Sequence, residues 1–198
     1  AGALPGFLGF YVPIQTGHTS FGKSVCDISF GEAMFVRQGL AVGRHGDRFV
    51  HGERNGLKEG EPLTLMPRTV QFVELVAQGA RYTVCNFQGL ATWPKDDTPE
   101  RLSQSQRLAA FLASIAGAKV LCGDFNAAPD TESISIISRG MRNVLRDRSV
   151  ATTRSALYEF SRNEVSDYIF ISSDVTVRSF EIPAVLVSDH LPLVLEFS

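Results

Sequence analysis

The segment AKVLCGDFNAAPDT, residues 118–131, places an acid and an amide directly after an apolar run. Residues 118–122 are typical of a buried strand, and Pro129 indicates that a loop follows. Asp124 and Asn126 should therefore lie where the strand ends. In an extended segment these two side chains leave on the same side, so both would face one site.

This pair of side chains suits the hydrolysis of a phosphoester, which needs a cation to neutralise the phosphoryl oxygens and a group that activates water. Asp124 can accept a proton from water or bind Mg²⁺, which prefers oxygen ligands. Asn126 can offer its amide to phosphate. Taken alone, a Gly-Asp before a proline-containing loop is more often a turn and a cap, so the interpretation depends on further motifs.

A second motif, Ser188-Asp189-His190, lies between the apolar runs 183–187 and 193–197. Asp189 provides a carboxylate for metal binding. His190 can stabilise phosphate as an imidazolium or take up a proton. An isolated Asp-His pair more often has a structural role. This pair, however, lies at a predicted strand end, as Asp124 does.

The pattern predicts an α/β protein of one domain, residues 1–198, with a mixed sheet and helices outside. Thr98 and Pro99 open the clearest helix, which continues to Ile115. We expect irregular chain in the first thirty residues and a short hairpin followed by a loop over residues 39–60. The other expected elements are a hairpin of strands 69–77 and 81–87, strands 33–37, 118–122, 167–171, 175–177, 183–187 and 193–197, and a helix over 132–138 capped by Thr131.

Composition restricts the class of substrate. The 198 residues are 44% hydrophobic with a formal charge of −2, so they offer no basic excess for holding long nucleic acid and favour a small phosphoester. No apolar run reaches the roughly 20 residues that cross a bilayer. The three cysteines are odd in number and far apart, which predicts buried, reduced thiols in a cytoplasmic protein: Cys26, Cys85 and Cys122.

Three motifs in this order resemble the endonuclease/exonuclease/phosphatase superfamily of metal-dependent phosphoesterases. They are GDFN at 123–126 with Pro129-Asp130, SDYIF at 166–170 and SDHLPL at 188–193. The resemblance runs from about Phe30 to Ser198. It implies a four-layer α/β/β/α sandwich with two mixed sheets, whose motif loops gather at one edge.

The resemblance also implies roles for single residues. Asp124 is similar to the residue that orients or deprotonates the attacking water, and Asn126 to one that binds the phosphate. Asp189 resembles a carboxylate close to the metal, Mg²⁺ or Mn²⁺. His190 resembles the histidine that contacts the scissile phosphate, and Asp167 the carboxylate that fixes its tautomer.

The chain departs from the family pattern at two places. Members begin with a strand, a helix and a second strand ending in a metal-binding Glu; this N-terminal unit has no counterpart here, which predicts an exposed sheet edge and self-association. None of Asp27, Glu32 and Asp47 lies in comparable surroundings. Gln88, in Asn86-Phe87-Gln88, occupies a position where many relatives carry His. Gln can donate to phosphate but cannot transfer a proton near neutral pH.

Several other residues are weaker candidates. Arg154 precedes the Asp167 segment and can steady a substrate phosphate. Two interpretations are open for Trp93, Lys95 and Arg101. They line the opening of a substrate site, or they are a half-buried ring and two solvated basic residues. The remaining histidines lack metal-ligand spacing and are expected in loops: His18, His45 and His51.

The leading hypothesis is a Mg²⁺- or Mn²⁺-dependent hydrolase of phosphoesters: a phosphodiesterase, nuclease or phosphatase. The first alternative is a catalytically inactive member that serves as a binding or scaffold module, since the expected Glu and His are both missing. The second is that another chain supplies the missing strands and Glu.

Overall fold

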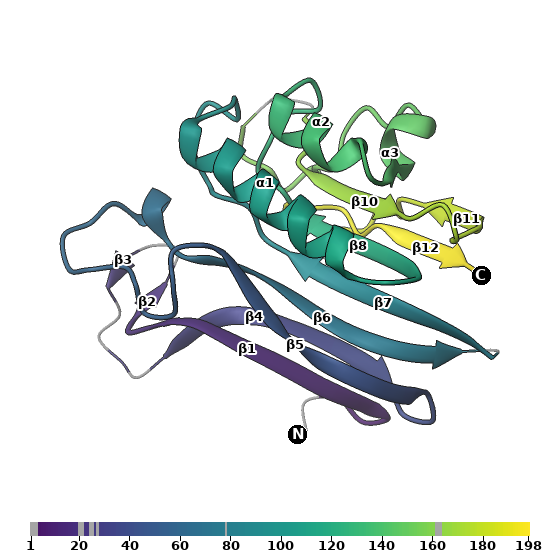
Figure 1. Ribbon diagram of the computed structural model, residues 1–198. Coiled ribbons are helices and arrows are strands. Elements are labelled where there is room, and N and C mark those ends of the chain that lie inside the picture. Colours follow the sequence, from purple (N-terminus) through teal and green to yellow (C-terminus); the bar gives the residue numbers. More distant parts are fainter. Residues whose placement is uncertain (1–3, 20–21, 24–25, 27, 78, 161–163) are drawn as a thin grey trace.

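A six-stranded mixed sheet forms the centre of the computed structural model, which describes residues 4–19, 22–23, 26, 28–77, 79–160 and 164–198 (Figure 1). Its strand order is β5-β6-β7-β8-β10-β9. The β7–β8 pair is parallel and the other four pairs are antiparallel. The strands are β5 (Ala41–His51), β6 (Arg68–Ala77), β7 (Ala80–Phe87), β8 (Ala118–Asp124), β9 (Arg142–Asn143) and β10 (Asp167–Ile171).

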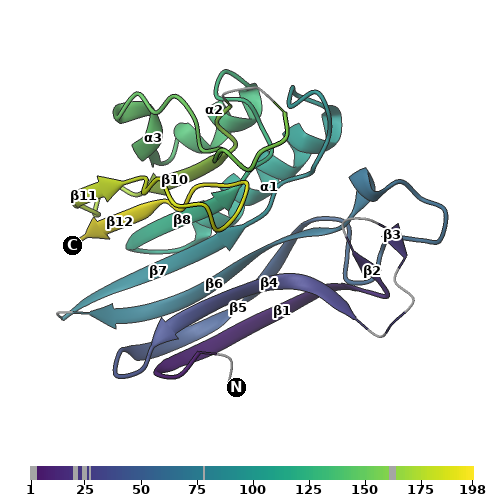
Figure 2. The same cartoon turned by 180° about the vertical axis from the view of Figure 1, so that it is seen from behind.

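The helices α1 (Pro99–Ser114), α2 (Glu132–Ser138) and α3 (Val144–Asp147) lie together on one face of this sheet (Figures 1 and 2). Helix α1 forms the crossover that a parallel pair requires between β7 and β8. Its first turn is capped by Thr98, whose hydroxyl oxygen accepts a hydrogen bond from the Arg101 N–H at 3.2 Å.

Two strand pairs lie on the other face of the sheet: β1 (Phe7–Thr16) with β4 (Ser29–Arg37), and β11 (Val177–Glu181) with β12 (Val194–Phe197) (Figure 2). The Gln71 side chain joins the layers by donating to the Phe10 carbonyl at 2.8 Å. The α/β class is thus confirmed, whereas a fourth, helical layer stays a prediction. The remaining elements are β2 (His18–Thr19), β3 (Gly22–Lys23) and the short 3₁₀ helix η1 (Leu63–Leu65).

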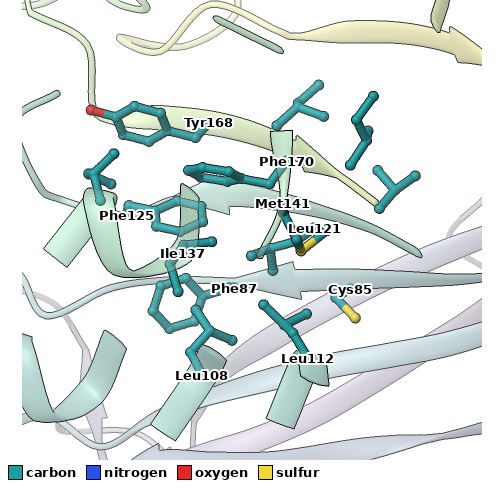
Figure 3. Packing of buried hydrophobic residues seen from close by; sticks show 14 of the residues in the cluster. Cys85, Phe87, Leu108, Leu112, Leu121, Phe125, Ile137, Met141, Tyr168 and Phe170 are labelled. Atoms are coloured by element: carbon teal, nitrogen blue, oxygen red, sulfur yellow. The ribbon is translucent and has the colours of Figure 1, made fainter. Parts of the chain in front are cut away.

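Aromatic rings fill the core between the helices and the sheet (Figure 3). The Phe125 ring centre lies 5.0 Å from that of Phe87 and 5.3 Å from those of Tyr168 and Phe170. The edge-on and tilted contacts are the arrangements that aromatic quadrupoles favour. Phe125 belongs to the GDFN motif, so the same four residues supply both a core ring and the acid at the strand end.

Two glycines let the ends of β7 and β8 approach each other closely. A Cβ on Gly123 would lie 1.9 Å from the Phe87 carbonyl oxygen, and one on Gly89 would lie 2.1 Å from that of Phe125. Gly123 also has φ +143, a backbone conformation that residues with a side chain rarely adopt. The Gly89 N–H donates to the Asp124 carbonyl at 2.7 Å, so the segments after both strands stay side by side.

The strongest local patterns predicted their elements correctly. The expected hairpin appears as β6 and β7, with its turn partly outside the described residues at Gln78. The helix that starts at Pro99 and the short helix capped by Thr131 are both present. The predicted strands 33–37, 118–122, 167–171 and 193–197 correspond to parts of β4, β8, β10 and β12.

The prediction of irregular chain near the N-terminus was wrong, because β1 pairs with β4 along most of its length. Gly9 and Pro13 concealed this strand, since both residues are unfavourable inside a strand. The structure accommodates them locally: the Phe35 ring packs over Gly9, and the register shifts between Pro13 and Gln15.

Three other strand predictions were also wrong. Residues 39–60 form one long strand, β5, and a loop instead of a short hairpin, so His45 and His51 lie on a strand. His18, also expected in a loop, lies on the short strand β2. The strand predicted at 175–177 begins only at Val177. Residues 183–187 form a turn and exposed loop, with a hydrogen bond from the Val185 N–H to the Pro183 carbonyl.

The cysteines fit their prediction only in part: Cys85 is buried and Cys122 half-buried, but Cys26 is exposed. All three are free thiols. Among the described residues, no helix is both long and apolar enough to cross a bilayer.

Replacing Phe170, which is fully buried in the aromatic core, tests this packing. Phe170→Ala should lower the free energy of unfolding by about 3–5 kcal/mol through lost burial and the remaining cavity. Urea unfolding measures the change. The control Leu186→Ala removes an exposed side chain and should change stability by less than about 0.5 kcal/mol. Equal effects of the two substitutions would contradict the proposed core.

Candidate active site

The ends of β8 and β10 bring two motif carboxylates and the histidine together. Asp124 and Asp167 are register partners on these antiparallel strands. His190 reaches them from the segment before β12, where it forms a β-bridge with Arg154. One ligand atom from each of Asp124, Asp167 and His190 lies within 4.8 Å of the other two.

Asp167 fixes the orientation of the histidine ring. Its two carboxylate oxygens lie 2.8 and 2.9 Å from His190 Nδ1, so this nitrogen must carry the proton that it donates. The Thr153 hydroxyl donates to Asp167 Oδ2 at 2.6 Å and holds the carboxylate in place. The other ring nitrogen, Nε2, is thereby directed to the site, 4.0 Å from Asp124 Oδ2.

Arg154 faces the same ring nitrogen. Its Nη1 contacts His190 Nε2 and lies 3.6 Å from Asp189 Oδ2. The guanidinium also lies over the Tyr158 ring, 4.4 Å from its centre, and its Nε is 3.4 Å from Glu164 Oε1. This nearly buried cation is thus held from three sides beside the histidine.

The pKa values of the two central groups are shifted upward. Burial raises the pKa of Asp124, and the nearby charge of Asp167 raises it further. Burial alone would lower the pKa of His190, but the hydrogen bond and charge of Asp167, with the charge of Asp124, outweigh it, and the pKa rises above its ordinary value. The two carboxylates therefore favour a cation between or beside them.

The structure corrects the expected geometry of Asn126. The segment is not extended there, because Asn126 has φ +52, and its side chain is buried. Its own N–H donates to Asp124 Oδ1 at 2.9 Å, and its amide Nδ2 donates to the Gly89 carbonyl at 3.3 Å. Since the amide nitrogen carries two hydrogens, one remains for another acceptor.

Asp189 lies at the margin of the group. Its Oδ2 is 4.0 Å from His190 Nε2, and its side chain is half exposed. Within the described chain it is not part of the compact set formed by Asp124, Asp167 and His190. A role for Asp189 as a metal ligand stays a prediction.

The residues expected at a substrate mouth occupy three different environments. Arg101 is buried and donates to the carbonyls of Leu90 and Asp96, so it organises the loop before α1 instead of being solvated. Lys95 is also largely buried and pairs with Glu164 at 3.3 Å. Trp93 is exposed rather than half-buried.

Sequence reasoning missed several polar residues around the site. Glu164 lies between Lys95 and Arg154, and Thr153 supports Asp167. Glu32 and Arg68 lie behind Gln88. These contacts connect residues 10 to 69 positions apart and follow no local pattern. Asp27, considered for the missing acid, lies outside the described residues.

A family model described as the Endonuclease/Exonuclease/phosphatase family matches residues 33–190. The chain belongs to this family. Its members are in general hydrolytic phosphoesterases, so the resemblance found in the three motifs is confirmed. No curated protein matches the chain.

Solved structures support the fold of the family. The chain is similar to a Bacteroides thetaiotaomicron mannosyl-6-phosphatase, with 18% identity, a TM-score of 0.70 and coverage of 99% of this chain and 78% of that one. The human Nocturnin catalytic domain with bound sulfate has 19% identity and a TM-score of 0.73, with coverage of 98% of this chain and 72% of that one. D. rerio TDP2 complexed with a single-strand DNA product has 14% identity and a TM-score of 0.70, with coverage of 98% of this chain and 77% of that one.

Replacing Asp167 with Asn in metal-free protein tests the electrostatic origin of the histidine shift. Asp167→Asn removes the charge that favours the imidazolium, so the pKa of His190 should fall. NMR titration of the His190 ring measures this change. Resonances of His51, four strands away on β5, should not move. An unchanged pKa of His190 would contradict the proposed electrostatic cause.

The same substitution should change the pH dependence of stability. A raised folded-state pKa stabilises the protein below the unfolded value, about 6.5, and this contribution is lost as pH rises through the folded value. The stability advantage of wild type over Asp167→Asn should therefore be larger at pH 5.5 than at pH 9. Urea unfolding at both values measures it.

Proposed function

We propose that the chain hydrolyses phosphoesters with Mg²⁺ or Mn²⁺ bound beside Asp124. The observation that carries the proposal is the placement of His190 Nε2, which Asp167 directs toward Asp124 and which Arg154 contacts. Phosphoester hydrolysis requires a base, an acid and a cation around one point. Here these groups would be the His190 ring with its fixed tautomer, Asp124 and the Arg154 guanidinium.

The carboxylates fit a hard divalent cation. Burial raises the pKa of Asp124, and the charge of Asp167 raises it further, so a bound cation would stabilise the ionised carboxylate. We assign Asp124 and the half-exposed Asp189 as the residues that would hold the ion. When bound, the ion would neutralise charge on the phosphoryl oxygens.

The chain's own groups have separable roles in this proposal. Asp124 orients the attacking water. His190 accepts a proton at Nε2 in its neutral form, and donates from that atom when protonated, with Asp167 stabilising the charge. Arg154 binds a phosphoryl oxygen. The free N–H groups of Asn126 and Gln88 are further donors to the phosphate.

The structural relatives include a protein named as a sugar phosphatase and one bound to a DNA product, so both monoesters and diesters are reasonable substrates to test. The formal charge of −2 supports a small phosphoester over a long nucleic acid. We therefore propose 4-nitrophenyl phosphate and bis(4-nitrophenyl) phosphate as the first probes.

We expect hydrolysis of at least one of these probes with Mg²⁺ or Mn²⁺, loss of the activity with EDTA and recovery on adding metal. Asp124→Asn and His190→Gln should each lower kcat by at least about 100-fold, because each removes a group that acts in the transition state. The exposed Asp174→Asn serves as the matched control and should retain full activity. Full activity of both site variants would refute the assigned roles.

A catalytically inactive binding module is the second candidate, and the side chain of Gln88 favours it: Gln88 cannot transfer a proton at a position where the family resemblance implies His in many relatives. Metal binding separates the two candidates. Calorimetry should detect Mg²⁺ or Mn²⁺ binding with a Kd of millimolar or tighter, weakened at least about tenfold in Asp124→Asn by loss of a charged ligand. Absence of Mg²⁺ and Mn²⁺ binding, together with no turnover of either probe, would favour the binding module.

A further inference from the structure

Gln88 follows directly after β7, and its side chain shares a face of the sheet with Asp124. The parallel register pairs Asn86 with Cys122, so two residues further along both strands Gln88 comes opposite Asp124. Side chains in register on neighbouring strands point to the same face. The hydrogen bond from the Gly89 N–H to the Asp124 carbonyl confirms that the segments are still adjacent there.

Two buried ionisable residues contact Gln88 and fix its position. Arg68 Nη1 donates to Gln88 Oε1 at 2.9 Å, and Glu32 Oε1 accepts from the Gln88 main-chain N–H at 3.3 Å. Glu32 comes from β4 and Arg68 from β6, so the two layers of the protein meet at Gln88. We call Glu32 and Arg68 the Gln88 clamp.

The Arg68 contact fixes which end of the amide faces the site. A guanidinium can only donate, so the carbonyl oxygen of the Gln88 amide must face Arg68. The NH₂ group then points away from the clamp, and it has no hydrogen-bond partner among the described residues. Without Arg68 the amide could rotate by half a turn and present an acceptor, which would repel a phosphate oxygen.

A contribution to the stability of the fold does not explain the Gln88 clamp. Glu32 Oε2 and Arg68 Nε are buried without a hydrogen-bond partner in the described chain. Burial raises the pKa of Glu32 to about 8 and lowers that of Arg68 to about 10, so burial disfavours the charge on each residue. Apolar residues would avoid this penalty, whereas a fixed donor beside Asp124 requires these polar groups.

We propose that Glu32 and Arg68 are positioning residues that orient Gln88 so that its NH₂ group binds a phosphoryl oxygen of the substrate. The inference rests on the proposed phosphoesterase function. Gln88 then acts as a donor whose charge does not change with pH, in place of a group that transfers protons. Arg68 acts only through Gln88, which distinguishes it from a residue that merely stabilises the fold.

A double-mutant cycle tests this dependence with bis(4-nitrophenyl) phosphate or, if only the monoester is turned over, 4-nitrophenyl phosphate. Gln88→Met and Arg68→Met should each raise KM about tenfold, the scale of one hydrogen bond to a charged group, with a smaller change in kcat. The double variant should be no worse than Gln88→Met alone. Independent, multiplying effects would overturn the proposal. Gln38→Met and Arg37→Met replace exposed residues and should leave KM unchanged.

The polarity of the amide gives a second test. Gln88→Glu keeps an acceptor for Arg68 but removes the donor, so it should raise KM by more than tenfold. Gln88→His should stay within about threefold of wild type, because one ring nitrogen can accept from Arg68 while the other donates to the site. If Gln88→Glu binds the substrate as well as wild type, the amide is not a phosphate donor.

NMR of the Gln88 side-chain amide provides a readout without turnover. In the metal-loaded protein, inorganic phosphate should shift the NH₂ resonances, and the shift should be lost in Arg68→Met, or reduced in Arg68→Lys if Arg68→Met does not fold. No shift in wild type would overturn the inference even if the enzyme is active. A shift without hydrolysis of any phosphoester would support the clamp and refute the hydrolase.

Discussion

The close approach of β7 and β8 at their carboxyl ends is the constraint on which the rest of the site depends. Only glycine fits at positions 89 and 123, because a Cβ at either would overlap a carbonyl oxygen of the facing segment. This contact places Phe125 in the aromatic core and Asp124 at the carboxyl end of the central strand β8. The core therefore fixes the main chain of the candidate active site directly, without an intervening flexible loop.

Oppositely charged side chains contact one another at this end of the sheet. His190 lies between Asp167 and Arg154, and Glu164 lies between Arg154 and Lys95. Asp167 thus compensates His190, and Glu164 compensates both Arg154 and Lys95, without a change in side-chain position. Such preorganisation lowers the cost of reorientation during reaction. The ion pairs with Glu164 also explain why the largely buried cations Lys95 and Arg154 can persist next to His190.

The sequence predicted the parts of the molecule that are specified locally. The helix after Thr98 and the strand before Gly123 have caps and apolar patterns within their own segments, and the three family motifs carry the site's central residues. Strand β1 was not predicted, because Gly9 and Pro13 disrupt its pattern and its stability comes from pairing with β4. Arg68 and Glu164 were not predicted, and Glu32 was considered only as a replacement for the missing metal-binding Glu, because contacts between distant segments do not show in the spacing along the chain.

The β-bridge between Arg154 and His190 affects which insertions the chain can tolerate near the candidate site. Ser155 donates its N–H to the Asp189 carbonyl, and Thr153 donates its N–H to the Glu164 carbonyl, so the segment from Ser155 to Glu164 is anchored at both ends. Each doubling of a loop's length costs only about 0.6 kcal/mol in closure entropy. Insertions or exchanges in this segment can therefore alter the leaving groups that reach the site while the histidine and its partners keep their geometry. Under the proposed function, substrate range and chemistry would then depend on separate parts of the chain.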